Sequence, residues 1–167
     1  AAEALGMKIV GYDPFLSEGV KAALSADTEI VEDINDIFKK SDYITIHVPL
    51  NDATKDTVNK DTLALCKDGV RILNFARGGL VNSADMIAAL ESGKAAAYVT
   101  DFPSDEVIGV DGVIAIPHLG ASTPESEDNC AVMPNRFRYV LLRFCSGGYG
   151  PLCSSSLGYI GDKGSFH

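Results

Sequence analysis

The feature that most constrains the fold is an alternation along residues 7–116, in which short apolar runs rich in β-branched residues are followed by segments of helical periodicity. The runs that predict strands are 8–12, 28–31, 43–48, 70–75, 96–100 and 113–116. The segments that predict helices are 17–24, 32–40, 59–66, 83–92 and 124–133. Several apolar runs contain almost no polar residue, which is typical of strands covered on both faces. The alternation therefore predicts an α/β fold, a doubly wound parallel sheet with helices on each side.

The amino-acid composition disfavours nucleic acids, membranes and metal ions as partners. The 167 residues carry a net charge of −9, and an acidic excess disfavours a nucleic-acid partner, which needs clustered basic residues. No apolar run reaches the ~18 residues of a membrane span, so we expect no membrane partner. The four cysteines share no CxxC spacing and predict no metal site. No secretory signal opens the chain, so we expect a cytoplasmic protein with reduced thiols.

The chain divides into two parts near Pro134. Its first residues, 1–6, are typical of the last turn of a helix that ends at Gly6. Residues 1–133 hold the acidic excess, whereas residues 134–167 are weakly basic and show no sustained period after Phe144. We therefore predict a domain over 1–133 and a tail over 134–167. We expect this tail to pack poorly, as disordered or unrelated sequence from a shifted or misjoined reading frame.

Polar side chains follow four of the predicted strands. Asp13 follows the first strand, Arg77 the fourth, Asp101 the fifth and His118 the sixth. Ligands of such sheets bind beyond the carboxyl ends of the strands. We therefore expect these four side chains to share one edge of the sheet and to form the binding site.

Each of these positions allows more than one interpretation. Asp13 can accept hydrogen bonds from both ribose hydroxyls and repel a 2′-phosphate, which favours NAD over NADP, or it can simply open an Asp-Pro turn. Arg77 precedes two glycines, where its guanidinium can clamp a carboxylate, although it can also be an ordinary surface arginine. By comparison, His47 lies inside an apolar strand and is expected to be a packed histidine.

His118 is the predicted proton shuttle. A nearby carboxylate would fix its tautomer and stabilise its protonated form, and by spacing alone either Asp105 or Glu106 could be that carboxylate. The glycine run at 147–150 lacks the flanking strand and helix of a phosphate loop.

Three of these strand-end segments carry a family resemblance. They are Asn74-Phe75-Ala76-Arg77-Gly78-Gly79, Asp101 with Glu106 five residues on, and Pro117-His118-Leu119-Gly120-Ala121-Ser122-Thr123. Together, over about residues 1–133, they resemble the D-2-hydroxyacid dehydrogenases, and within that family the D-3-phosphoglycerate dehydrogenases. The resemblance implies a Rossmann-like NAD-binding domain of an oxidoreductase that transfers a hydride between NAD and a D-2-hydroxy acid. The implied reaction is 3-phosphoglycerate to 3-phosphohydroxypyruvate, the first step of serine biosynthesis.

The same resemblance implies roles for single residues. Arg77 would bind the substrate carboxylate, His118 would be the acid/base and Glu106 its carboxylate partner. It further implies a small-molecule substrate, a homo-oligomer for the full-length protein, and a set of residues that line the cofactor: Asp13, Pro49, Phe75, Ala76, Arg77, Asp101, His118, Gly120 and Ala121.

The sequence departs from the family pattern in three places. The glycine-rich phosphate loop would lie upstream of Ala1, so we expect a truncated nucleotide-binding domain that binds NAD weakly. Asp101-Phe102-Pro103 replaces the usual Asp-Val-Phe, and Pro134 begins unrelated sequence. We expect negligible turnover by the chain alone.

The alternatives to the implied function are a glyoxylate/hydroxypyruvate reductase, a D-lactate dehydrogenase, or a non-catalytic dinucleotide-binding interaction module. Joint presence of Arg77, Glu106 and His118 favours an enzyme.

Overall fold

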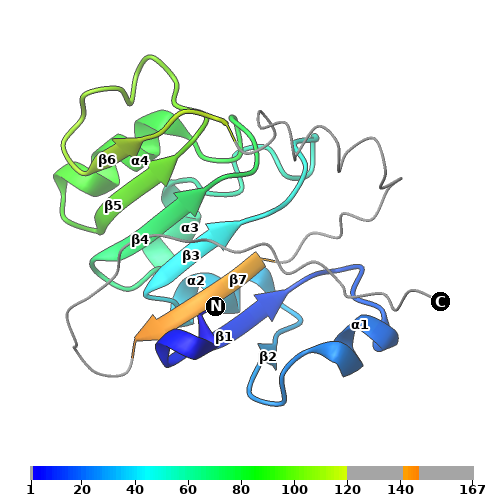
Figure 1. Cartoon of the computed structure of the whole chain (residues 1–167). Coiled ribbons are helices and arrows are strands. Elements are labelled where there is room, and N and C mark those ends of the chain that lie inside the picture. Colours follow the sequence, from blue (N-terminus) through cyan, green and yellow to red (C-terminus); the bar gives the residue numbers. More distant parts are fainter. Residues whose placement is uncertain (1, 120–140, 147–167) are drawn as a thin grey trace.

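The computed structural model describes residues 2–119 and the backbone of residues 141–146. Helices and strands alternate along the chain, as the sequence predicts (Figure 1). The elements in order are η1 (Glu3–Leu5), β1 (Met7–Tyr12), α1 (Glu18–Ala23), β2 (Glu29–Ile30), α2 (Ile34–Lys40), β3 (Tyr43–Ile46), α3 (Lys60–Leu65), β4 (Val70–Asn74), α4 (Ser83–Glu91), β5 (Ala95–Thr100), β6 (Val113–Ala115) and β7 (Leu141–Ser146). All six predicted strands and four of the predicted helices are confirmed. The predicted helix 124–133 lies outside the described residues.

The strands form one seven-stranded sheet in the order β2-β1-β7-β3-β4-β5-β6 (Figure 1). The pairs β1–β2, β3–β4, β4–β5 and β5–β6 are parallel. β7 runs antiparallel to both of its neighbours, β1 and β3. Because β1 and β3 both oppose β7, they share one direction, so the six predicted strands all end at the same edge of the sheet.

The position of β7 corrects the expectation for part of the tail. Residues 141–146 belong to the segment 134–167, which we expected to pack poorly, yet they pair over six positions with β1 and over three with β3. The physical reason is that β1 and β3 would otherwise face each other with unpaired backbone N–H and C=O groups, and an apolar β-prone segment satisfies both rows. The division of the chain into 1–133 and 134–167 otherwise stays a prediction.

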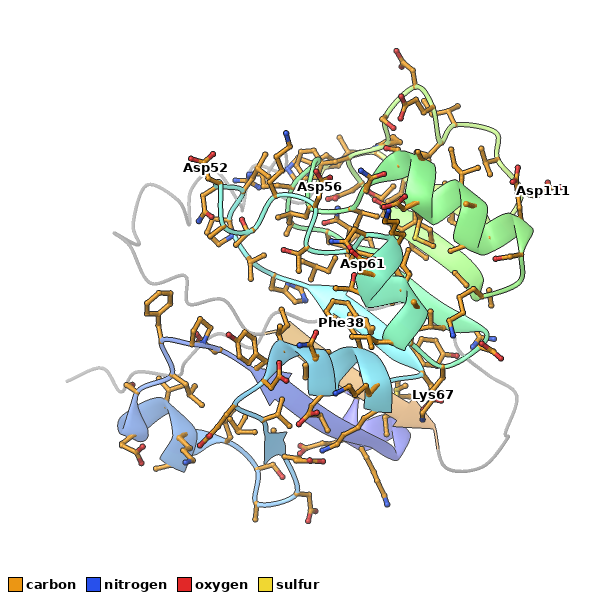
Figure 2. All side chains as sticks on the ribbon, turned by 180° about the vertical axis from the view of Figure 1, so that it is seen from behind. Phe38, Asp52, Asp56, Asp61, Lys67 and Asp111 are labelled. Atoms are coloured by element: carbon orange, nitrogen blue, oxygen red, sulfur yellow. The ribbon has the colours of Figure 1, made fainter. Side chains whose placement is uncertain are left out.

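Three helices cover one face of the sheet. α2, α3 and α4 lie behind the sheet in Figure 1 and in front of it in Figure 2. The fully buried side chains of this core come from the helices (Ile37, Phe38 and Met86) and from the strands (Ile44 and Ile72). Each such side chain contributes about 1.5–3 kcal/mol when it leaves water. The helix-covered face therefore holds the core that fixes the strand ends in place.

The helix ends follow the signals in the sequence. The Asn82 side chain accepts a hydrogen bond from the amide of Asp85 and begins α4, and Gly93, with φ 76°, follows its last turn. Gly6, with φ 74°, likewise ends the short helix at the start of the chain. Both ends match the predicted N-cap and C-cap residues.

Candidate active site

The predicted site residues gather at one edge of the sheet. Asp13, Arg77, Asp101 and His118 all follow strands that share a direction, so the expectation that Arg77 and His118 lie on the same edge is confirmed. The amide of Ile116 donates to the carbonyl of Thr100 at 3.0 Å and continues the β5–β6 pairing toward His118. The ends of β5 and β6 therefore lie side by side.

His118 meets a carboxylate directly. Its Nδ1 lies 2.6 Å from Oδ2 of Asp101. The Asp101 side chain is only 12% exposed, whereas that of His118 is 46% exposed. The second carboxylate oxygen of Asp101, Oδ1, is buried and has no hydrogen-bond partner among the described residues. It therefore presents a buried acceptor to any ligand that carries an N–H or O–H donor.

An aromatic ring joins His118 to Arg77. The ring centroids of Phe102 and His118 are 4.2 Å apart at an interplanar angle of 41°. The guanidinium carbon of Arg77 lies 5.8 Å from the centroid of the same phenyl ring. The imidazole and the guanidinium are thus held near each other through Phe102, a residue that the sequence analysis noted only as a departure from the family pattern.

The turn that carries Arg77 is held by a buried asparagine. Asn74, at the end of β4, donates from Nδ2 to the carbonyl of Arg77 at 2.9 Å and accepts from the amide of Ala76 at 3.2 Å. Gly79 has φ 79°, where a side chain would be strained, so the chain can turn sharply just after Arg77. This role of Asn74 was not predicted from the sequence, although a polar residue that closes an apolar strand is a signal for it.

Arg77 itself is exposed. Its Nη1 donates to the carbonyl of Ala76 at 2.7 Å. Over residues 2–119, no carboxylate forms an ion pair with it. The guanidinium therefore keeps donors available for an anionic group at the strand edge.

The pairing expected for Glu106 does not form. Glu106 is exposed, in a turn that follows β5, and the carboxylate on His118 is that of Asp101. Asp105, the other candidate by spacing, is exposed in the same turn. The reason is that Asp101 directly follows β5 beside the end of β6, whereas the chain has turned away by residue 105.

Asp13 opens a turn. Its Oδ1 accepts a hydrogen bond from the amide of Phe15 at 2.8 Å, which confirms the Asp-Pro turn interpretation. Contact with a ribose stays a prediction. The other predicted cofactor-lining residues differ in their exposure. Phe75 and Ala76, which lie in the sequence between β4 and Arg77, are half-buried, and Pro49 is exposed after β3. Gly120 and Ala121 lie outside the described residues.

His47 is a half-buried histidine that directly follows β3, whose last residue Ile46 pairs with Asn74 of β4. Its Nε2 lies 2.9 Å from Oγ1 of Thr45, and burial lowers the pKa of its imidazole. The prediction of a packed histidine is consistent with this environment.

A cavity of about 290 Å³ lies beside Phe102 and is lined by Gly78, Gly79, Val81, Ser83, Tyr98, Phe102, Pro103, Ser104 and Val107.

No helix within the described part of the chain has the length and apolar character needed to cross a membrane. Over residues 2–119, no three His, Cys, Asp or Glu side chains gather into a group that could hold a metal ion.

The sequence matches a protein family over most of its length. Residues 1–120 match the model of the D-isomer specific 2-hydroxyacid dehydrogenase NAD binding domain. The chain belongs to the D-2-hydroxyacid dehydrogenase family. NAD is the cofactor of this family's domain, and one similar structure, a D-lactate dehydrogenase from Lactobacillus jensenii, was determined with NAD+. That structure has a TM-score of 0.65 and 27% identity, covering 76% of this chain and 43% of its own.

Two curated relatives show the range of this dehydrogenase family. A D-3-phosphoglycerate dehydrogenase from Methanocaldococcus jannaschii is 40% identical over 132 residues, 75% of this chain and 25% of the relative. A hydroxypyruvate reductase from Thermotoga maritima is 39% identical over 135 residues, 75% of this chain and 42% of the relative. The chain thus spans about a quarter to two-fifths of the length of these relatives.

The residues present fit the NAD of the dehydrogenase family. The buried, unpartnered Oδ1 of Asp101 is an acceptor suited to a carboxamide N–H. The second oxygen of Asp13 can accept from a hydroxyl while Oδ1 holds the turn. Both groups lie after strands that end at the same edge.

Proposed function

We propose that this chain is the NAD-binding part of a dehydrogenase that converts 3-phosphoglycerate to 3-phosphohydroxypyruvate. The observation that carries the proposal is the grouping of Arg77, Phe102, His118 and Asp101 at one edge of the sheet. The 40% identity to a D-3-phosphoglycerate dehydrogenase supports the choice of substrate. The same proposal makes this reaction the first step of serine biosynthesis. It also places the full-length protein in the cytoplasm as a homo-oligomer.

The proposed chemistry divides between two side chains. The guanidinium of Arg77 binds the carboxylate of the 2-hydroxy acid in a bidentate pair. The imidazole of His118 takes the proton of the substrate hydroxyl as the carbonyl forms. NAD, when bound, supplies the acceptor for the hydride. Glu106 does not contact the imidazole in the structure, and in this proposal it adds negative charge to the surroundings of His118.

A second candidate is a hydroxypyruvate or glyoxylate reductase. The 39% identity to a hydroxypyruvate reductase supports it nearly as well, because Arg77 and His118 would act on either 2-hydroxy acid in the same way. A D-lactate dehydrogenase and a non-catalytic dinucleotide-binding module are the remaining alternatives. A proton-shuttling histidine paired with a carboxylate favours an enzyme over such a module.

Calorimetric titration of the chain with NAD and with NADP tests the cofactor assignment. We expect NAD to bind more tightly than NADP, because the Asp13 carboxylate repels a 2′-phosphate. Asp13→Asn is the matched variant, since its amide oxygen can still accept from Phe15 while the charge is removed. This variant should discriminate less between the two cofactors. Tighter binding of NADP by the unchanged chain would overturn the assignment of Asp13.

Activity in a full-length form of the protein tests the substrate. Comparison of kcat/KM for 3-phosphoglycerate, glycerate and D-lactate separates the candidates, and turnover of none of them would leave the interaction module.

A further inference from the structure

The loop between β3 and α3 lies along the segment that leads from Arg77 into α4. The amide of Asp56 donates to the carbonyl of Gly79 at 2.9 Å. Val58 then forms a parallel bridge with Val81, which continues the contact toward α4. The contact between the two segments therefore begins only two residues after Arg77.

Asp56, which Figure 2 labels, has an unusual backbone conformation at this contact. Its φ is 50°, and among the described residues it is the one non-glycine residue in the left-handed region. Aspartate tolerates this region better than most residues, but the conformation persists only where neighbouring groups hold it. Its amide binds Gly79, and its carbonyl accepts from Nδ2 of Asn59 at 2.9 Å. Because Asn59 also caps the start of α3, Asp56 links that helix to the turn after Arg77.

Leu50, at the other end of the loop, packs against the same glycine. A Cβ on Gly79 would lie 3.5 Å from both terminal carbons of Leu50, so the leucine methyl groups lie over the glycine backbone. Between Leu50 and Asp56, the side chain of Asn51 closes the loop, because its Oδ1 accepts from the amide of Thr54 at 3.0 Å. Gly79 is therefore contacted by both ends of one hydrogen-bonded loop.

Arg77 thus lies between two anchored carbonyl groups. Asn74 binds the carbonyl of Arg77 itself, and Asp56 binds that of Gly79, two residues on. Within residues 2–119, no carboxylate forms an ion pair with the guanidinium. The backbone of the turn therefore sets the position of this side chain, and a misplacement of about 1 Å in such a group can cost roughly 100-fold in rate.

We propose that Leu50 and Asp56 are positioning residues for Arg77, and that the loop over residues 50–58 fixes the guanidinium for a substrate carboxylate. The carboxylate itself rests on the proposed function. The order of the turn after Arg77 is a property of the chain and does not depend on any reaction.

The first measurement is ¹⁵N NMR relaxation in the 167-residue chain, read at the amides of Arg77, Gly78 and Gly79. Asp56→Pro removes the amide hydrogen and fixes φ at about −65°, so it should break the contact with Gly79. The order parameters of these amides should then fall from about 0.85 to below about 0.6. Asp56→Gly keeps the amide and readily adopts a positive φ, so it should keep the order of the turn. Leu50→Ala should lower the order at Gly79.

Asp52→Ala is the control, since Asp52 is an exposed acid on the outer side of the same loop (Figure 2). It should leave the order of the turn unchanged, and ordered amides of β5 in each variant show that the sheet is folded. Unchanged order in Asp56→Pro would overturn the role of Asp56. Unchanged order in Leu50→Ala would overturn the role of Leu50, and this variant decides the proposal if the proline variant does not fold.

Titration with D-glycerate tests the link to the substrate carboxylate. The Nε–H signal of Arg77 should shift on binding, with an apparent Kd that rises about 10-fold in Asp56→Pro and stays within about twofold in Asp56→Gly. A lower Tm in Asp56→Pro with an unchanged Kd would reduce the loop to a structural role and overturn the proposal. No shift of Arg77 in the unchanged chain would contradict the carboxylate site of the proposed function, whereas the relaxation result would still decide whether the loop orders the turn.

Discussion

Arg77 presents a guanidinium that no carboxylate within residues 2–119 neutralises, on a turn fixed by Asn74. If the proposed reaction is the right one, Arg77→Ala should raise KM and lower kcat in a form of the protein with measurable dehydrogenase activity. Loss of a charge-assisted pair costs about 1.5–3 kcal/mol, a fall of roughly 10- to 100-fold in kcat/KM. Arg71→Ala is the control, because Arg71 is exposed near the start of β4 over the Tyr43 ring, away from the carboxyl ends of the strands. An equal loss in both variants would contradict the assignment.

His47 gives a pH-dependent contribution to stability. Because burial lowers its pKa below 6.5, the unfolded state takes up a proton before the folded state does as the pH falls. The folded chain is therefore stabilised relative to the unfolded chain above pH 6.5 and loses that contribution as the pH falls below it. Thermal unfolding from pH 7.5 to about 5 should show a larger loss of Tm for the unchanged chain than for His47→Gln. Parallel curves would show that His47 does not contribute.

For single residues, the sequence predicts which side chains reach the site but not which of them touch. The strand-end rule is enough to place Arg77, Asp101 and His118 on one edge. The choice of Asp101 over Glu106 depends on the β5–β6 register, in which Thr100 pairs with Ala115. Spacing along one chain contains no information on that register, so the sequence could not predict the contact of His118 with Asp101.

Among the elements, β7 is the one that connects distant parts of the chain. Leu142 pairs with Gly11 on one side and with Thr45 on the other. Leu142→Pro should remove a backbone donor from a central strand and lower stability by about 1–3 kcal/mol, which is roughly 2–10 °C in Tm. Leu142→Val, which keeps the N–H, should change Tm much less. Equal Tm values for the proline variant and the unchanged chain would show that β7 is dispensable.

Local pattern predicts the strands of residues 7–116 because their apolar runs and flanking turns lie in the same short window. It does not predict the place of β7, because the vacancy between β1 and β3 is a property of the assembled sheet. The apolar character of residues 141–146 indicates a strand, but nothing local indicates its partners.

For the whole molecule, the proposed reaction needs more surface than this edge provides. Hydroxyacid chemistry requires the carboxylate, the nicotinamide and the imidazole in contact within a site closed to water. His118 is 46% exposed, so the site is open on the side of the imidazole. We expect the 167-residue chain on its own to give negligible turnover of 3-phosphoglycerate with NAD, measured by NADH absorbance. Turnover comparable to that of a full-length form would contradict this expectation.

The antiparallel strand also has a consequence for the order of assembly. β3, β4, β5 and β6 each pair with the next of these strands along the chain, so loop closure costs little there. In the strand order, β7 lies between β1 and that half of the sheet, and its pairing of Met7 with Ser146 joins residues near the two ends of the described chain. During synthesis the half that carries Arg77, Asp101 and His118 can therefore form while β7 is still unmade.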